Sequence, residues 1–321
     1  MYKILQTMMM IAHGVIAGAW SFLVGVLDFT FTRAGDQYGI DSGGDLVKST
    51  ANNAAFIDGE GILLEGARTN LFLNSFVPAT QTVTVAAVPH TITVKGTGDI
   101  TVSGVGAGVA TEGSPLTLTP TAGGLICTLN GSLDNVNLEA AAFGSSFIET
   151  AGASASRSLT SMTRVWPFPA NDFSGQIKVR PQFEHDDTKG VARLLYLSDG
   201  TADNRISISY TTADDRIDMF KTLSAGSSAG PTTVLNNLLY SKGDLLNIRF
   251  RQDAVGLHMW VNSETKISTT VGNSPDSFTV LMDQIDIGFE TPIAGRNAFQ
   301  TVESFRVWNE AKSDSFMENL T

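Results

Sequence analysis

Short runs in which apolar and polar residues alternate recur along most of the chain. Val83 and Val85 alternate with threonines, and so do Ile92 and Val94 a few residues later. A period of two places every second side chain on the same face of a strand. Such runs follow one another to about residue 160, separated by Gly, Pro or Asn-Gly turns. The pattern predicts a β-sandwich of roughly a hundred residues, from 61 to 161.

A second series of alternating runs occupies residues 162–321. Pro167 and Pro169 lie near its beginning, as is typical of a linker between domains. Only residues 313–320 have a helical pattern, and Ser313 is placed to cap that helix. We therefore expect a second sandwich that ends in one short helix.

The N-terminal stretch 8–27 carries no acidic or basic side chain, and His13 is its only titratable group. Lys3 and the small residues 17–19 fit a signal peptide. The length of about twenty residues and a GxxxG pattern fit a membrane span. The third interpretation is an apolar helix buried between subunits or against another protein of an assembly. We adopt the third as the expectation, with these contact residues: Met9, Ile11, Val15, Ile16, Trp20, Phe22 and Leu23.

Charge narrows the possible partners. Charged residues make up 17% of the chain, and the net charge is −11. A duplex-DNA binder needs a field of Lys and Arg to displace counterions from phosphates, so we expect no nucleic-acid partner. The same balance disfavours electrostatic attachment to anionic lipid. Cys127 is the only cysteine, so no intramolecular disulfide can form, and its apolar neighbours predict a buried small side chain.

The motifs of common enzyme classes are missing. The histidines are far apart, and neither a GxSxG elbow nor a GxxxxGK[ST] phosphate loop occurs. A glycosidase needs two carboxylates across a cleft. The acidic clusters are flanked by turn residues and fit solvated loops: Glu184, Asp186 and Asp187, then Asp214, Asp215 and Asp218. We expect no catalytic activity.

Two weaker candidates for binding remain. Asp199, Asp203 and Asn204 lie in one short turn, and carboxylate and amide oxygens suit calcium, although the composition also fits an ordinary β-turn. His258 and Trp260 alternate with aliphatic residues on one predicted strand and would share its other face. That face could meet another subunit, line the inside of a curved sheet, or contact a glycan.

Two signatures frame the first predicted sandwich. The opening signature is Gly61-Ile-Leu-Leu-Glu-Gly-Ala-Arg-Thr-Asn-Leu71 followed by Asn74-Ser75. It resembles the LLxEGARTNLLxNS pattern of many phage and prophage structural proteins. The closing signature, residues 137–157, resembles the QLEAGxFxTSYIPTTGAxxTR end of the same module. Phe147 stands there where Tyr is usual, and Glu149 stands where Pro is usual. The resemblance implies phage origin without indicating which appendage.

The C-terminal half resembles laminin-G and concanavalin A-like sandwiches. The run Leu257-His-Met-Trp-Val-Asn262 is similar to their xLYVNG strand, and Phe305-Arg-Val-Trp-Asn-Glu-Ala311 precedes a last short helix. Such modules bind glycans or act as scaffolds, and fold analogy does not distinguish these roles. We expect Trp308 to pack beneath the terminal helix.

Together these observations predict an all-β protein of three parts: an anchor and arm (1–60) with an apolar helical segment, a sandwich (61–161) and a concanavalin A-like sandwich (162–321). The resemblance implies a surface protein of a phage virion, either a capsid decoration or head fibre, or a tail fibre. It also implies a homotrimer, other virion proteins as partners, and host glycans as a possible ligand. The alternatives are a receptor-binding tail protein that recognises host sugar and a membrane-anchored lectin-like protein.

Overall fold

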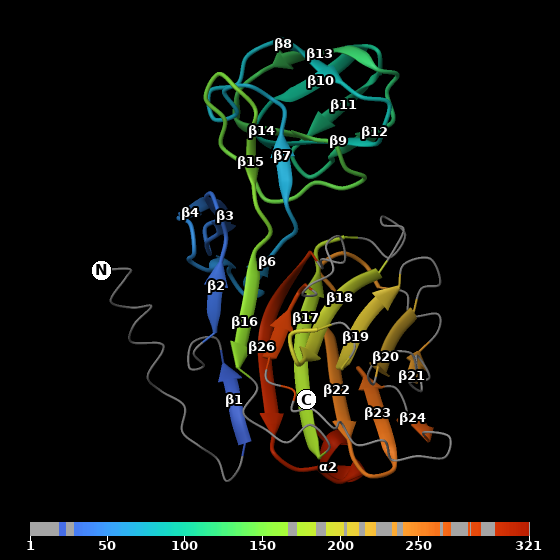
Figure 1. The fold of residues 1–321 in the computed structure, drawn as a ribbon. Helices are drawn as coiled ribbons and strands as arrows, with labels where there is room; N and C mark the ends of the chain where they lie inside the picture. Colours follow the sequence, from blue (N-terminus) through green and yellow to red (C-terminus); the bar gives the residue numbers. More distant parts are fainter. Residues whose placement is uncertain are drawn as a thin grey trace, which may run out of the picture. The chain divides into compact units, whose positions relative to one another are not determined.

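The computed structural model describes residues 19–23, 29–165, 172–183, 191–201, 204–211, 216–222, 233–235, 240–263, 266–270, 282, 284–289 and 299–320. For residues 19–23, 233–235 and 269–270 it describes the backbone alone. Strands dominate the described chain (Figure 1). The chain divides into two compact units. Unit 1 comprises residues 1–31, 56–65 and 161–321, and unit 2 comprises residues 32–55 and 66–160.

The two units are interleaved in sequence. The expected boundary between residues 161 and 162 differs by one residue from the division at 160/161. The expected arm 1–60 is instead shared, because 32–55 belongs to unit 2 and the rest to unit 1. Strands β2 (Thr30–Thr32) and β5 (Ala55–Ile57) mark two of the points where the chain passes between the units.

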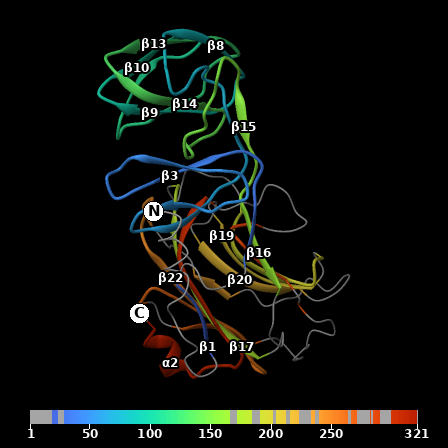
Figure 2. The same ribbon diagram turned by 90° about the vertical axis from the view of Figure 1, so that its left-hand side faces the viewer.

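Unit 2 is a sandwich of two antiparallel sheets, which form separate layers in Figures 1 and 2. The four-stranded sheet has the order β11-β10-β13-β8, and the five-stranded sheet has the order β12-β9-β14-β7-β15. In chain order the strands are β7 (Arg68–Asn70), β8 (Gln81–Val85), β9 (His90–Gly96), β10 (Asp99–Gly104), β11 (Gly108–Thr111), β12 (Leu116–Leu118), β13 (Gly123–Asn130), β14 (Leu133–Glu139) and β15 (Ala155–Arg157). A hairpin of β3 (Gln37–Ile40) and β4 (Leu46–Ser49) also belongs to this unit.

The core of unit 2 lies between the two sheets. Val83 and Val85 from one sheet and Ile92 and Val94 from the other are all buried in a single cluster. The predicted alternation therefore selected the core face correctly. Cys127 is fully buried in the same cluster, as expected, and burial raises the pKa of its thiol to about 11.

Unit 1 also has two sheets. One follows the path β24-β23-β22-β17-β26-β6, and the other follows β16-β25-β18-β19-β20-β21. In chain order their strands are β6 (Gly61–Leu64), β16 (Ser161–Val165), β17 (Phe173–Pro181), β18 (Val191–Ser198), β19 (Arg205–Thr211), β20 (Arg216–Thr222), β21 (Thr233–Leu235), β22 (Leu246–Gln252), β23 (Gly256–Val261), β24 (Ile267–Thr270), β25 (Gln284–Ile287) and β26 (Gln300–Trp308).

The N-terminal segment differs from the expected helix. Residues Ala19–Leu23 form strand β1, which pairs antiparallel with β26 in unit 1. The helical expectation is therefore wrong for the part that contains Trp20, Phe22 and Leu23. The other expected contact residues, Met9, Ile11, Val15 and Ile16, lie outside the described residues. Within the described ranges, no helix is long and apolar enough to span a bilayer.

The chain ends in helix α2 (Asp314–Glu318), capped as expected by Ser313, whose hydroxyl accepts from the Phe316 amide. Trp308 packs edge-on against Phe316, with ring centroids 5.3 Å apart, and it is buried as expected. Only one α2 side chain, Met317, is buried.

Two arginines of β22 hold this terminal segment. Arg249 Nη1 donates to the Met317 carbonyl at 2.9 Å and to the Glu318 carbonyl at 3.0 Å. Arg251 Nη1 donates to the Lys312 carbonyl and to Asp314 Oδ1, both at 2.7 Å. The last carbonyls of a helix lack partners from a further helical turn, and Arg249 donates to two of them, while Arg251 binds the beginning of the segment.

Candidate functional site

His258 and Trp260 lie in β23, whose six residues are all buried. Trp260 is 0% exposed, and the guanidinium of Arg251 lies 5.6 Å from its ring centroid. The two imidazole nitrogens of His258 lie within hydrogen-bond distance of Ser268 Oγ (2.8 Å) and Asp253 Oδ1 (3.1 Å). Burial lowers the pKa of His258 although Asp253 opposes this shift.

These two residues therefore form no exposed platform for a sugar, and that part of the sequence interpretation is wrong. Their face is covered within the chain rather than by a ligand. The sequence could not reveal this cover, because the arginines that draw residues 312–318 onto this face act about sixty positions away in the chain.

The turn at Asp199 uses its oxygens internally. Asp199 Oδ1 accepts from the Thr201 amide and hydroxyl, and Oδ2 accepts from Asn204 Nδ2 at 2.7 Å. These contacts lower the pKa of Asp199 although burial opposes the shift. Asp203 lies outside the described residues. Among the described side chains, no group of three His, Cys, Asp or Glu could hold a metal ion.

One face of the β18-β19-β20-β25 sheet in unit 1 is polar. On β19, Ser207 and Ser209 share that face, and their cross-strand partners on β20 are Phe220 and Asp218. Two guanidinium groups flank the Phe220 ring, that of Arg193 at 4.8 Å and that of Arg205 at 5.3 Å from its centroid. This polar face was not predicted from the sequence, because the candidate binding residues, His258 and Trp260, lie in the other sheet of unit 1.

Asp218 is central to this face and corrects a second expectation. It is 6% exposed on a strand rather than solvated in a loop. Its Oδ2 accepts from Thr211 Oγ1 and Arg216 Nε, both at 3.0 Å. Among the described residues, Asp218 Oδ1 and Ser207 Oγ are buried without a hydrogen-bond partner. The other residues of the predicted acidic clusters, Glu184, Asp186, Asp187, Asp214 and Asp215, lie outside the described ranges.

The two signatures meet inside unit 2. Asn70 of the opening signature donates from Nδ2 to the carbonyls of Val136 (3.1 Å) and Ile148 (2.8 Å). Its Oδ1 accepts from the amides of Phe72 (3.0 Å) and Leu138 (2.9 Å). Asn70 is fully buried, so this carboxamide satisfies main-chain groups that water cannot reach.

A second pair of residues repeats the connection. Ser75 donates through its hydroxyl to the Ile148 carbonyl, and its amide donates to Thr150 Oγ1 at 2.8 Å. Thr150 donates back from its amide to Ser75 Oγ at 2.9 Å and from its hydroxyl to the Phe72 carbonyl at 2.6 Å. These reciprocal bonds lock the end of the opening signature against the closing one.

Two buried ionisable side chains complete the closing signature, each hydrogen-bonded to a serine. Glu139 is 0% exposed, and it accepts from the Ser145 amide (2.7 Å) and hydroxyl (2.5 Å). Burial raises the pKa of Glu139, while these two bonds and the nearby Arg157 and Arg68 oppose the shift. Arg157, also buried, donates to Ser146 Oγ at 2.6 Å. The two bonds from Ser145 thus satisfy the buried carboxyl group of Glu139 within the fold.

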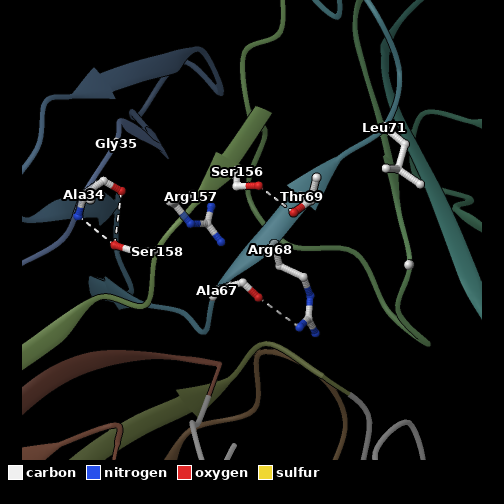
Figure 3. Close-up of a pocket in the computed structure, with 10 residues that line it drawn as sticks. Ala34, Gly35, Ala67, Arg68, Thr69, Leu71, Ser156, Arg157 and Ser158 are labelled. Carbon is white, nitrogen blue, oxygen red and sulfur yellow. Dashed lines mark hydrogen bonds between the residues drawn. The ribbon is translucent and has the colours of Figure 1, made fainter. Parts of the chain in front are cut away.

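Strands β7 and β15 border a pocket of about 650 Å³ in unit 2 (Figure 3). On β7 and β15, Thr69 faces Ser156, and their hydroxyls lie 2.7 Å apart. Ser158 Oγ accepts from the Ala34 amide at 2.6 Å and donates to the Ala34 carbonyl at 3.1 Å. The lining is Ala34, Gly35, Ala67, Arg68, Thr69, Leu71, Ala140, Ser156, Arg157 and Ser158. These described residues include neither an aromatic ring nor a carboxylate.

No family model matches the chain, and no curated protein matches it. Several solved structures are similar to part of it. A NanB structure with Optactamide is 15% identical over 50% of this chain and 26% of its own, with a TM-score of 0.41. Domain 4 of AbnA, a GH43 arabinanase from Geobacillus stearothermophilus in complex with arabinotriose, is 15% identical over 50% and 72%, with a TM-score of 0.39.

The CBM40 of the Ruminococcus gnavus IT-sialidase, bound to α2,3-sialyllactose, is 14% identical over 46% of this chain and 80% of its own, with a TM-score of 0.38. This chain thus spans about a quarter of the NanB chain (26%) and a larger share of the two isolated domains. Similarity at this level does not indicate a shared activity.

Proposed function

We propose that this chain is a structural, non-enzymatic surface protein of a bacteriophage particle, assembled as a homo-oligomer with other virion proteins. The resemblance of its two signatures to phage structural modules supports the origin. The observation that carries the structural role is the use of the signature residues. The side chains of Asn70, Ser75 and Thr150 form hydrogen bonds between the opening and the closing signature.

The hydrogen bonds of the signature residues favour a structural role over an enzymatic role. Catalytic side chains need a free functional atom directed at a substrate, with a partner that tunes its pKa. Both Asn70 Nδ2 hydrogens and Asn70 Oδ1 are engaged, and Glu139 is closed off beneath Ser145. A motif used in this way maintains a scaffold, which is what a repeated surface protein requires.

Immunogold labelling followed by cryo-electron microscopy of intact phage particles tests the proposal. The antibody would be raised against the purified chain, and particles of an unrelated phage serve as the control. We expect label on the capsid or on the tail. Capsid label would identify a decoration or head fibre, and label at the tail tip would identify a receptor-binding role. Absence from the particles would overturn the proposal and favour the membrane-anchored alternative.

A second candidate function is glycan binding by unit 1. The polar face of the β18-β19-β20-β25 sheet favours it, because Asp218 Oδ1 and Ser207 Oγ are buried there without a partner among the described residues. Arg205, Arg216 and Phe220 border that face and are half-buried. Guanidinium groups beside an aromatic ring suit an acidic sugar, since they supply bidentate donors and a flat contact.

A glycan array probed with the purified chain tests this second function. We expect acidic glycans to be retained by the wild type and lost by Phe220→Ala and Arg205→Gln. Arg164→Gln, in β16 of the same unit, is the matched control for the lost charge and should still bind. Absence of any retained glycan, or equal retention by Phe220→Ala, would contradict glycan binding by this face.

A further inference from the structure

The outer face of the four-stranded sheet in unit 2 is almost free of charge. Register places Val109, Thr101 and Thr128 side by side across β11, β10 and β13. The next row contains Ser103, Ile126 and Thr82 from β10, β13 and β8. All six side chains are exposed or half-buried, and the opposite face of the same strands forms the core.

A single charged side chain lies on this face. Asp99, at one corner, accepts from Thr101 Oγ1 at 3.0 Å and from Asn130 Nδ2 at 2.8 Å, so its charge is partly satisfied within the sheet. No lysine or arginine occurs at the outward positions of β8, β10, β11 and β13, all of which are described. Charged side chains spread over such a surface usually keep a soluble protein from associating through it.

Two large apolar side chains are exposed on this face. Val109 is 51% exposed and Ile126 is 39% exposed. Around them lie hydroxyl groups, chiefly of threonine. A hydroxyl both donates and accepts hydrogen bonds, so a face that presents hydroxyls can be its own complement. Such self-complementarity is what a contact between identical subunits requires.

The charge of the whole chain limits the choice of occupant. At a net charge of −11, two copies repel one another wherever acidic surfaces meet. This nearly uncharged face is where a second copy can approach while bringing the fewest like charges together. A basic partner would find no carboxylate to pair with except the corner residue Asp99, and a nucleic acid would find no cation.

We propose that the outer face of the β11-β10-β13-β8 sheet, centred on Thr101 and Ile126, is a contact between copies of this chain. The apolar side chains supply the buried area, and the threonines supply mutual hydrogen bonds. The inference does not rest on the virion role, because association of copies is measured on the purified protein, whereas the virion role is tested on particles.

Sedimentation velocity of the full chain over a range of concentrations, at physiological ionic strength, tests the inference. We expect the wild type to associate and Ile126→Lys to weaken the association constant at least about tenfold, because each copy would bring a lysine to the contact. Val88→Lys is the matched control: Val88 is 44% exposed in the loop between β8 and β9, off this face, so its association should equal that of the wild type.

A second variant covers the case in which Ile126→Lys fails to fold. Thr101→Cys places a thiol at the centre of the face, and the native Cys127 is buried. We expect Thr101→Cys to form disulfide-linked dimers under mild oxidation and Val88→Cys to form none above background. A monomeric wild type at the highest attainable concentration, or equal association of wild type and folded Ile126→Lys, would overturn the proposal. So would equal cross-linking at the two cysteine positions.

Discussion

The side-chain amide of Asn70 donates a hydrogen bond of 2.8 Å to the carbonyl of Ile148, although 78 residues separate them in the chain. The bond joins the opening signature to the closing one. Neither signature can therefore be understood alone: each provides the polar groups that the other leaves unsatisfied when it is buried.

Asn70→Ala should destabilise the protein strongly. The substitution removes four hydrogen bonds. It leaves the Val136 carbonyl and the amides of Phe72 and Leu138 buried without this partner, while the Ile148 carbonyl keeps its bond from Ser75. Each buried unsatisfied group costs about 1–3 kcal/mol, so we expect a loss of at least about 3 kcal/mol in the free energy of unfolding. Denaturant unfolding measures it. Asn53→Ala, which removes only local bonds of an exposed side chain, should cost less than about 1 kcal/mol.

Gly61→Ala and Gly59→Ala should differ sharply. A Cβ at Gly61 would lie 2.2 Å from the Val302 carbonyl oxygen on the paired strand β26. At Gly59 nothing lies within 4 Å, and both glycines have positive φ. Gly59→Ala should lower the free energy of unfolding only by the strain of a left-handed backbone at alanine, about 1–2 kcal/mol. Gly61→Ala should cost several kcal/mol more, measured as a drop in the thermal midpoint. Equal midpoints would mean that β6 does not approach β26 closely.

Arg249→Met should loosen the end of the chain while unit 2 stays intact. The substitution removes the donors that bind the carbonyls of Met317 and Glu318. Hydrogen exchange measured by mass spectrometry should show faster exchange in residues 314–320 and unchanged exchange in residues 81–139. Arg164→Met, in strand β16 of the other sheet of unit 1, is the control and should leave 314–320 protected. Unchanged exchange at the helix would show that Arg251 and the packing of Phe316 and Met317 hold α2 without Arg249.

Tyr38 should titrate late. Burial raises its pKa to about 12, and the hydrogen bond from its hydroxyl to Glu149 Oε2 at 2.7 Å acts in the same direction. The neutral form is thus favoured by folding, so this stabilisation is present below pH 10 and is lost as the pH rises towards 12. Ultraviolet difference titration should show a tyrosine with a pKa near 12. Glu149→Gln should lower that pKa, and Tyr38→Phe should abolish the late step.

Cys127 should react only when the protein unfolds. Its side chain is 0% exposed, and burial raises the pKa of the thiol to about 11, so little thiolate is present near neutral pH. Iodoacetamide should leave the native protein unmodified at pH 8 and alkylate it fully in denaturant, as measured by intact mass. Rapid alkylation of the native protein would show that the core of unit 2 opens locally.

The sequence pattern predicted those parts of the fold that neighbouring residues determine, namely the core face of the strands and the start of the terminal helix. Alternation located the core positions Val83, Val85, Ile92 and Val94, and the cap at Ser313 located the one described helix. The interleaving of the units was not visible, because pairings such as β26 with β6 join residues more than two hundred positions apart. The strand at 19–23 was missed for a different reason: a continuous apolar run has no period that distinguishes a helix from a buried strand.

Site prediction failed where burial comes from a distant segment. The face of Trp260 was left with three possible neighbours, another subunit, the inside of a curved sheet or a glycan, and the structure buries it within the chain. Asp218 was assigned to a loop because turn residues flank its acidic cluster, whereas it lies on β20, pairs with β19 and is buried. The role of Asn70 had a signal that could have been used. An asparagine between alternating apolar runs has few ways to be buried except by satisfying main-chain groups.

The pairing of β7 with β15 has a consequence for how such chains change over time. Arg68 faces Arg157 directly across these two strands, so the two ends of the segment 66–160 lie next to each other. Inserted segments are tolerated when their ends lie close together, because the flanking chain keeps its path. Recombination could therefore insert, remove or exchange this segment, because the pairing of β7 with β15 holds its two ends together.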